Sequence, residues 1–196
     1  MKLSTHVLSS LDNWDANKKD FALMDACFAL EGTARNLYGR DVGKKDYKNC
    51  IRHYYWIFER MGNLGINLSE TKFDNVNIIK DLPNPDMADV IYHIFRCNFA
   101  HCNDIPPNFE LIPNSSDAHV MISKNGFQVR ENIIFGLLAI SVFSQVNKNN
   151  VTEGAHYLFW NSHRFEIKDW WGREDDFRGI VENEAPNPTR VTIKFK

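Results

Sequence analysis

The sequence predicts a mainly α-helical protein: a helical bundle over residues 1–150, with a β-hairpin at about 119–130, and an aromatic-rich, partly β extension over 151–196. Three observations predict this class. Apolar residues recur at helical spacing through the first half of the chain. An Asn-Gly pair then separates two alternating segments. Aromatic residues gather after residue 150, where helical periodicity weakens.

Two helices are expected first. The first apolar stripe follows the spacing i, i+4, i+7, i+11, i+14 and consists of Leu23, Cys27, Leu30, Ala34 and Leu37. It predicts a helix from about Asp15 to Tyr38 that stops at Gly39, because glycine commonly ends helices. The second stripe repeats this spacing and consists of Tyr47, Ile51, Tyr54, Phe58 and Met61. It predicts a second helix that ends at the glycines and asparagine of residues 62–65.

The third helix, the hairpin and the closing helix follow in that order. The third helix starts near Asp86 and must end before Pro106-Pro107. The hairpin turns at Asn125-Gly126, since both residues tolerate positive φ. The helix over about 131–147 is apolar nearly all round, which is typical of a helix buried at the centre of a bundle.

The last part of the chain is expected to pack on the bundle. Residues 151–196 are too few to form a good core of their own. Residues 190–196 alternate in the manner of an edge strand. Trp170 and Trp171 could stack on bases, but we expect them to cover a core or an interface, the commoner role of such residues.

Charge and cysteine usage bound the environment and the partners. The net charge is −2, so the chain lacks the strongly basic character that would announce nucleic acid. It also lacks an apolar signal segment and a CxxC pair, so we expect a soluble cytoplasmic protein with reduced thiols and no membrane contact. Residues 35–60 nevertheless hold seven Lys and Arg against three acids. Lys44, Lys45, Lys48 and Arg52 are therefore candidate RNA contacts, or a plain solvated helix face.

One segment could carry chemistry. Tyr92-His-Ile-Phe-Arg-Cys-Asn-Phe-Ala-His101 places Arg96 and His101 in an Arg-x4-His pattern late on the third helix. This block, with helices before it and a hairpin and buried helix after it, resembles the HEPN superfamily (higher eukaryotes and prokaryotes nucleotide-binding domain) over about residues 15–147. The resemblance implies a metal-independent endoribonuclease without cofactor, acting as a homodimer on RNA. It further implies a toxin or antiviral role, with an antitoxin-like protein as a possible partner.

The residue types suit that chemistry. Histidine can move protons near neutral pH, and an arginine can contact two phosphate oxygens of the charged intermediate. RNA cleavage would leave a 2′,3′-cyclic phosphate. Asn98 could orient the His101 imidazole or bind phosphate, and Glu31 could hold the Arg96 guanidinium if the two helices face each other. Arg96 and His101 lie about 140° apart on an ideal helix, so a loosened turn or a shared dimer site would help them meet.

Two other interpretations stay open. The chain could be a non-catalytic nucleotide-, RNA- or protein-binding dimerisation module, because Cys97 stands where the family commonly has a polar residue. Alternatively, Asp89, Tyr92, His93 and Arg96 form an i, i+3, i+4, i+7 stripe that could be a plain solvated face.

A zinc site is the least favoured interpretation. His93, Cys97 and His101 recur every four residues, and their side chains suit zinc. Three ligands on consecutive turns of one helix cannot easily converge tetrahedrally, so no metal is expected. We predict that elemental analysis of the purified protein finds no stoichiometric zinc; one zinc per chain would contradict this.

Overall fold

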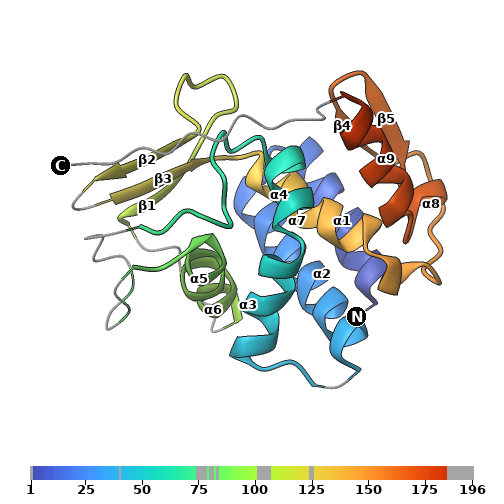
Figure 1. The fold of residues 1–196 in the computed structure, drawn as a ribbon, viewed down its shortest axis with the longest axis horizontal. Helices are drawn as coiled ribbons and strands as arrows, with labels where there is room; N and C mark the ends of the chain where they lie inside the picture. Colours follow the sequence, from blue (N-terminus) through green and yellow to red (C-terminus); the bar gives the residue numbers. More distant parts are fainter. Residues whose placement is uncertain are drawn as a thin grey trace.

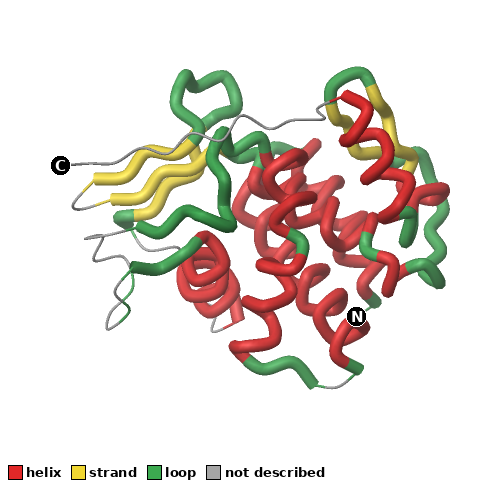
Figure 2. The backbone as a smooth tube through the Cα atoms, viewed as in Figure 1, coloured by secondary structure: helices red, strands yellow, loops and turns green. Residues whose placement is uncertain are grey.

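The protein is mainly helical in a computed structural model that describes residues 2–39, 41–73, 79, 82, 84–100, 107–123 and 126–184. This confirms the predicted class. Helices form the centre of the described part, and two small sheets lie at opposite sides of it (Figure 2). Within these residues, no helix combines the length and apolarity needed to cross a bilayer.

The N-terminal part forms two packed helices, α1 (Leu3–Asp15) and α2 (Lys19–Tyr38). The predicted helix therefore starts at Lys19 rather than Asp15, because Asn17 has a positive φ of 58° that interrupts the helical backbone. It ends where predicted, since Gly39 adopts the left-handed conformation with φ of 64°. The helix α1 was not predicted.

The predicted helix over 47–61 is divided in two, α3 (Lys44–His53) and α4 (Tyr55–Gly62). Tyr54 lies between them with φ −107° and ψ 21°, outside the helical region. Both halves keep the predicted apolar stripe in the core, where Tyr54 and Phe58 are fully buried. The break therefore redirects the chain without exposing the stripe. Gly62 ends α4, as predicted, and Asn63 follows it with a left-handed backbone.

The third predicted helix is a composite of α5 (Met87–Val90), the π-helical turn η1 (Ile91–Arg96) and α6 (Cys97–Ala100). Asp86 begins it with a capping box, because its side chain accepts the Asp89 amide hydrogen while the Asp89 side chain accepts that of Asp86. The π turn could not be read from the apolar pattern. Short π segments often occur at functional sites.

The predicted hairpin is confirmed: β2 (Val120–Ser123) pairs antiparallel with β3 (Gly126–Arg130), with Val120 opposite Val129. Residues 124 and 125 of its turn lie outside the described part. The strand β1 (Phe109–Ile112) was not predicted, and it pairs parallel to β3, giving the order β1-β3-β2. The buried Phe127 contacts Phe73 and Phe109 and so joins the sheet to the core.

The closing helix α7 (Ile133–Phe143) is buried almost all round, as predicted, and a short 3₁₀ turn, η2 (Gln145–Asn147), follows it. It packs on α2 and α4 and runs through the middle of the bundle (Figure 1). Gly136 of α7 permits the close approach to α4. A Cβ atom there would overlap the Phe58 ring and would lie 3.1 Å from the Phe58 carbonyl oxygen.

The C-terminal extension consists of β4 (Tyr157–Trp160), β5 (His163–Glu166), α8 (Ile167–Trp170) and α9 (Glu174–Glu184), up to the end of the described residues. Phe177 stacks on Phe143 of α7 with ring centres 4.4 Å apart, so the extension shares the core of the bundle. Trp171 is buried there and donates to Thr152 Oγ1 at 3.1 Å, which confirms its expected covering role. The edge strand expected at 190–196 lies outside the described residues.

The contact between α7 and α4 yields a stability prediction. Gly136→Ala should lower the free energy of unfolding by about 1–3 kcal/mol, because the added methyl overpacks a fully buried site against Phe58. Urea denaturation monitored by circular dichroism measures the change. Gly179→Ala on α9 is the matched control, since a Cβ there meets no atom within 4 Å. The control should be neutral or more stable by up to about 1 kcal/mol; equal stability of both variants would contradict the packing argument.

Candidate functional site

The Arg96 guanidinium is held by Glu31 at the face where η1 meets α2. Arg96 Nε and Nη2 lie 3.2 and 2.9 Å from Glu31 Oε2. The other carboxylate oxygen of Glu31 accepts a hydrogen bond of 3.1 Å from Arg35. The side chain of Arg96 is 24% exposed and that of Glu31 15%, so the pair is partly shielded from water. The contact expected between Glu31 and Arg96 is therefore present.

Aromatic rings and a buried thiol also lie near this ion pair. Arg96 Cζ lies 5.9 Å from the centre of the Tyr92 ring, and Tyr92 packs on Tyr47 with ring centres 5.6 Å apart. Burial raises the pKa of Tyr47 and that of the Cys27 thiol, the latter to about 12. Burial alone would lower the pKa of Arg96, but the Glu31 carboxylate outweighs it and the pKa is raised. Arg96 is thus a fixed cation, paired with the Glu31 carboxylate and lying beside uncharged phenol and thiol groups.

The structure describes two further residues of the motif segment, Asn98 and His93. Asn98 Nδ2 donates to the Ile94 carbonyl oxygen at 2.6 Å, so its amide is bonded to its own helix. Burial, followed by the charges of Lys44 and Lys48, lowers the pKa of His93, so its imidazole is neutral at pH 7. His101 lies outside the described residues. Its relation to Arg96, and the zinc interpretation that needs it, therefore stay predictions.

The four basic residues proposed to contact RNA fall into two groups. Lys44 and Lys45 are exposed at the start of α3. Lys48 instead pairs with Asp89 at 2.7 Å, and Arg52 Nε pairs with Asp86 at 2.8 Å. The structure therefore directs Lys48 and Arg52 toward α5 rather than toward solvent.

Asp86 and Asp89 are buried acids that sequence reasoning did not recognise as a site. Arg52 Nη2 contacts both, Asp86 at 3.1 Å and Asp89 at 3.2 Å, and Lys72 adds a third cation at 3.0 Å from Asp86. Burial opposes ionisation of Asp86, but Arg52, the Asp89 amide and Lys72 together hold its pKa well below the usual range. The solvated-face interpretation is wrong for Asp89, which is only 6% exposed.

Metal chemistry finds no support in the described residues. No group of three or more His, Cys, Asp or Glu side chains within them could hold an ion. Cys27 and Cys50 are buried in the core, and Cys97 is half-buried beside the motif.

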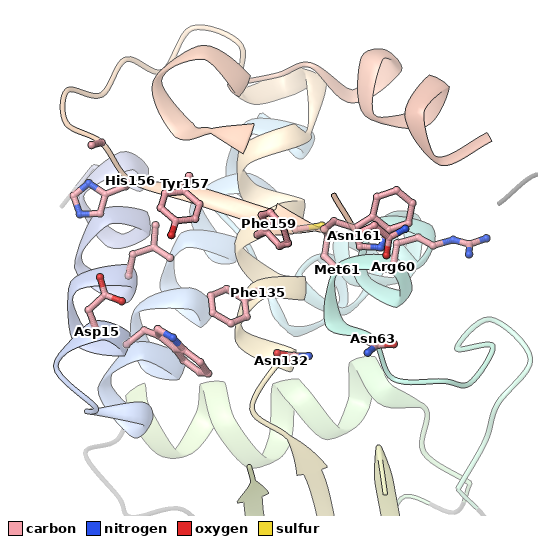
Figure 3. A pocket seen from close by; sticks show the side chains of 14 residues that line it. Asp15, Arg60, Met61, Asn63, Asn132, Phe135, His156, Tyr157, Phe159 and Asn161 are labelled. Atoms are coloured by element: carbon pink, nitrogen blue, oxygen red, sulfur yellow. The ribbon is translucent and has the colours of Figure 1, made fainter. Parts of the chain in front are cut away.

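A second feature is a cavity of about 670 Å³ between the bundle and the extension (Figure 3). It is bounded by α1, by the end of α4, by the start of α7 and by β4. Sequence reasoning missed it because, among the aromatics after residue 150, only Trp170 and Trp171 were considered, as cover for a core or an interface. The available signal was the alternation of Tyr157 and Phe159, which places these two side chains on one face of a strand.

The buried ion pairs at α5 yield a pH-dependent prediction. Asp86→Asn should cost about 3 kcal/mol of unfolding free energy at pH 7, because it removes the buried carboxylate that Arg52 Nε and Lys72 contact and leaves Arg52 with Asp89 alone. The folded-state pKa of Asp86 lies below its unfolded value, so its contribution is present above about pH 4 and is lost as pH falls further. The difference in unfolding free energy between wild type and Asp86→Asn, measured by urea denaturation from pH 7 to pH 3, should become smaller below pH 4. A difference that stays constant with pH would contradict the role given to the Asp86 carboxylate.

Comparison with known proteins places the chain in a family. A family model described as Rv1289 matches residues 2–196. Two uncharacterized proteins, Rv1289 of Mycobacterium tuberculosis and Mb1320 of Mycobacterium bovis, are each 35% identical to this chain over 181 residues. The matched part covers 89% of this chain and 85% of each relative. No solved structure matches the chain. On the extent of these matches, the chain belongs to the Rv1289 family.

Proposed function

We propose that the protein is a metal-independent endoribonuclease of the HEPN type, with Arg96 and His101 at its centre. One observation carries the proposal: Glu31 holds Arg96 at 2.9 Å on a π-helical turn, five residues before His101 in the sequence. A structural arginine on a solvated face would need neither a carboxylate from another helix nor a π turn. The mainly helical fold, with its hairpin before the buried helix α7, supports the same assignment.

The proposed reaction divides the work between the two residues. His101 removes the proton of a ribose 2′-hydroxyl, or protonates the leaving 5′-oxygen. The 2′-oxygen forms a bond to phosphorus while the bond to the 5′-oxygen breaks, which leaves a 2′,3′-cyclic phosphate. Arg96, a permanent cation, stabilises the negative charge on the phosphate oxygens. Glu31 acts as a positioning residue, because it fixes the guanidinium without touching RNA.

Substrate contacts and assembly follow from the same proposal. Lys44 and Lys45 are exposed and free to meet phosphates, whereas Lys48 and Arg52 stabilise the fold through Asp86 and Asp89. One chain thus offers few cations beside the motif. A homodimer that brings two copies of Arg96 and His101 together would double them, and a toxin-like ribonuclease of this kind would act with an antitoxin-like partner.

A non-catalytic binding module is the second candidate. Two donors of Arg96 already face Glu31, which lowers what the guanidinium can offer a phosphate. Cys97 follows it, where the HEPN resemblance would favour a polar residue. In that case the same face would bind RNA, a nucleotide or a protein without turnover.

Cleavage of an end-labelled single-stranded RNA in the presence of EDTA tests the first candidate. We predict that wild type cleaves and leaves 2′,3′-cyclic phosphate ends. His101→Ala should lower the rate by about 100-fold or more, the usual loss on removing a general acid or base. Arg96→Ala should lower the cleavage rate by a comparable factor. Glu31→Gln should lower it less, since the Arg96 guanidinium remains.

Two controls separate chemistry from folding. His53→Ala removes an exposed histidine of α3, and Arg173→Ala removes an exposed arginine far along the chain. Both should cleave at the wild-type rate. Equal cleavage rates for His101→Ala and wild type would contradict the ribonuclease proposal. RNA binding by wild type without cleavage would favour the non-catalytic module instead.

A further inference from the structure

The cavity between the bundle and the extension has the size of a ligand site. Its volume of about 670 Å³ falls within the roughly 300–1,000 Å³ typical of small-molecule pockets. Its lining comes from four segments that are distant in sequence, near residues 11–15, 60–63, 132–135 and 155–161. None of the residues proposed for RNA cleavage or RNA binding lines it. An inference about this cavity therefore does not rest on the proposed function.

Aromatic rings form two opposing walls. Tyr157 and Phe159 project from β4 into the cavity and face Phe135 of α7 (Figure 3). Phe135 is fixed by Trp14, which meets it edge-on with ring centres 4.5 Å apart. Phe159 is 59% exposed and Tyr157 45%, although both lie beside the core. Large aromatics left exposed around a hollow are typical of a binding surface for a flat apolar group.

The polar groups at the edge of these walls are available to a ligand. The amide side chains of Asn63 and Asn132 face each other at the floor of the cavity (Figure 3), and neither has a hydrogen-bond partner among the described residues. The floor also holds the first turn of α7, whose end carries partial positive charge. Unpaired amides beside aromatic walls suit the polar edge of a ring or its substituent.

The charge balance favours an anion. Arg60 lies at the end of the cavity opposite Asp15, with its guanidinium directed outward at the mouth (Figure 3). No carboxylate of the described residues forms an ion pair with Arg60, although its charge partly opposes the rise that burial causes in the pKa of the neighbouring Glu59. Asp15 in turn acts on the ammonium group of Lys19. Of the other acids nearby, Asp12 contacts His156 and Glu184 contacts His163. At the end of the cavity away from Asp15, the charge of the lining is therefore the positive one of Arg60.

We propose that this cavity binds a small aromatic anion, one or two flat fused rings that carry a carboxylate or a phosphate. The ring lies between the wall of Tyr157 and Phe159 and the wall of Phe135. The anionic group projects toward the mouth, where Arg60 meets it. The amides of Asn63 and Asn132 bind the polar edge of the ring.

Isothermal titration calorimetry with four probes tests the proposal and separates the two sources of the anion. Adenosine monophosphate represents ring phosphates and indole-3-acetate ring carboxylates, while adenosine and indole are their neutral counterparts. At least one anion should bind wild type about tenfold more tightly than its neutral counterpart, the effect of one ionic contact. Arg60→Ala should abolish that tenfold preference, and Phe159→Ala should weaken binding of the anion and of its neutral counterpart alike.

Matched variants guard against indirect effects. Arg173→Ala and Phe21→Ala remove an exposed arginine and a 56% exposed phenylalanine elsewhere, and both should bind as wild type does. Arg96→Ala should also leave binding unchanged, which separates this cavity from the proposed ribonuclease site. Failure of both anions to bind at millimolar concentration would overturn the proposal. Equal affinity for charged and neutral probes, or unchanged binding by Arg60→Ala, would overturn it too.

Discussion

The placement of the motif helix depends on the ion pairs between Asp86, Asp89 and the cations of α3. Asp86 caps α5 and accepts hydrogen bonds from both Nε and Nη2 of Arg52. One carboxylate therefore starts the helix and attaches it to α3. Lys48 adds a second ion pair to this turn through Asp89. With α5 fixed on α3, η1 lies against α2, where Arg96 meets Glu31. A buried carboxylate left unpaired would be costly, which makes this register specific.

A second constraint joins the extension to the bundle. Phe143 at the end of α7 meets Phe165 of β5 edge-on and stacks on Phe177 of α9. These contacts anchor the extension at one end of α7, while β4 passes over the other parts of α7 and α4 without filling the space beneath it (Figure 3). The cavity is thus a consequence of tight packing at one place and open packing at another. Its walls leave Tyr157 and Phe159 exposed, and large apolar side chains that stay exposed around a hollow are typical of a binding surface.

Local patterns could be predicted and distant pairings could not. The stripe from Leu23 to Leu37 and the stop at Gly39 depend on spacing and on one glycine, so they were predicted correctly. The hairpin at Gly126 depends on a local turn and was also predicted. The parallel strand β1, the ion pairs of Lys48 and Arg52, and the cavity join segments far apart in the chain, and no local pattern records such pairings. The contact of Glu31 with Arg96 was predicted only because the motif supplied a reason to look for a partner.

The same ion pairs change what the net charge of −2 means. The basic residues of 35–60 and the acids that follow them do not form two separate surfaces, because Lys48 and Arg52 are neutralised by Asp86 and Asp89 within the fold. The face beside the motif therefore offers Lys44, Lys45 and the Glu31-bound Arg96 rather than a continuous basic stripe. So few cations give weak contact with a phosphate backbone, and the salt dependence of that contact is shallow because it grows with the number of phosphates neutralised. For the proposed ribonuclease, a single chain would hold RNA poorly by charge alone, and the proposed homodimer would double the cations available.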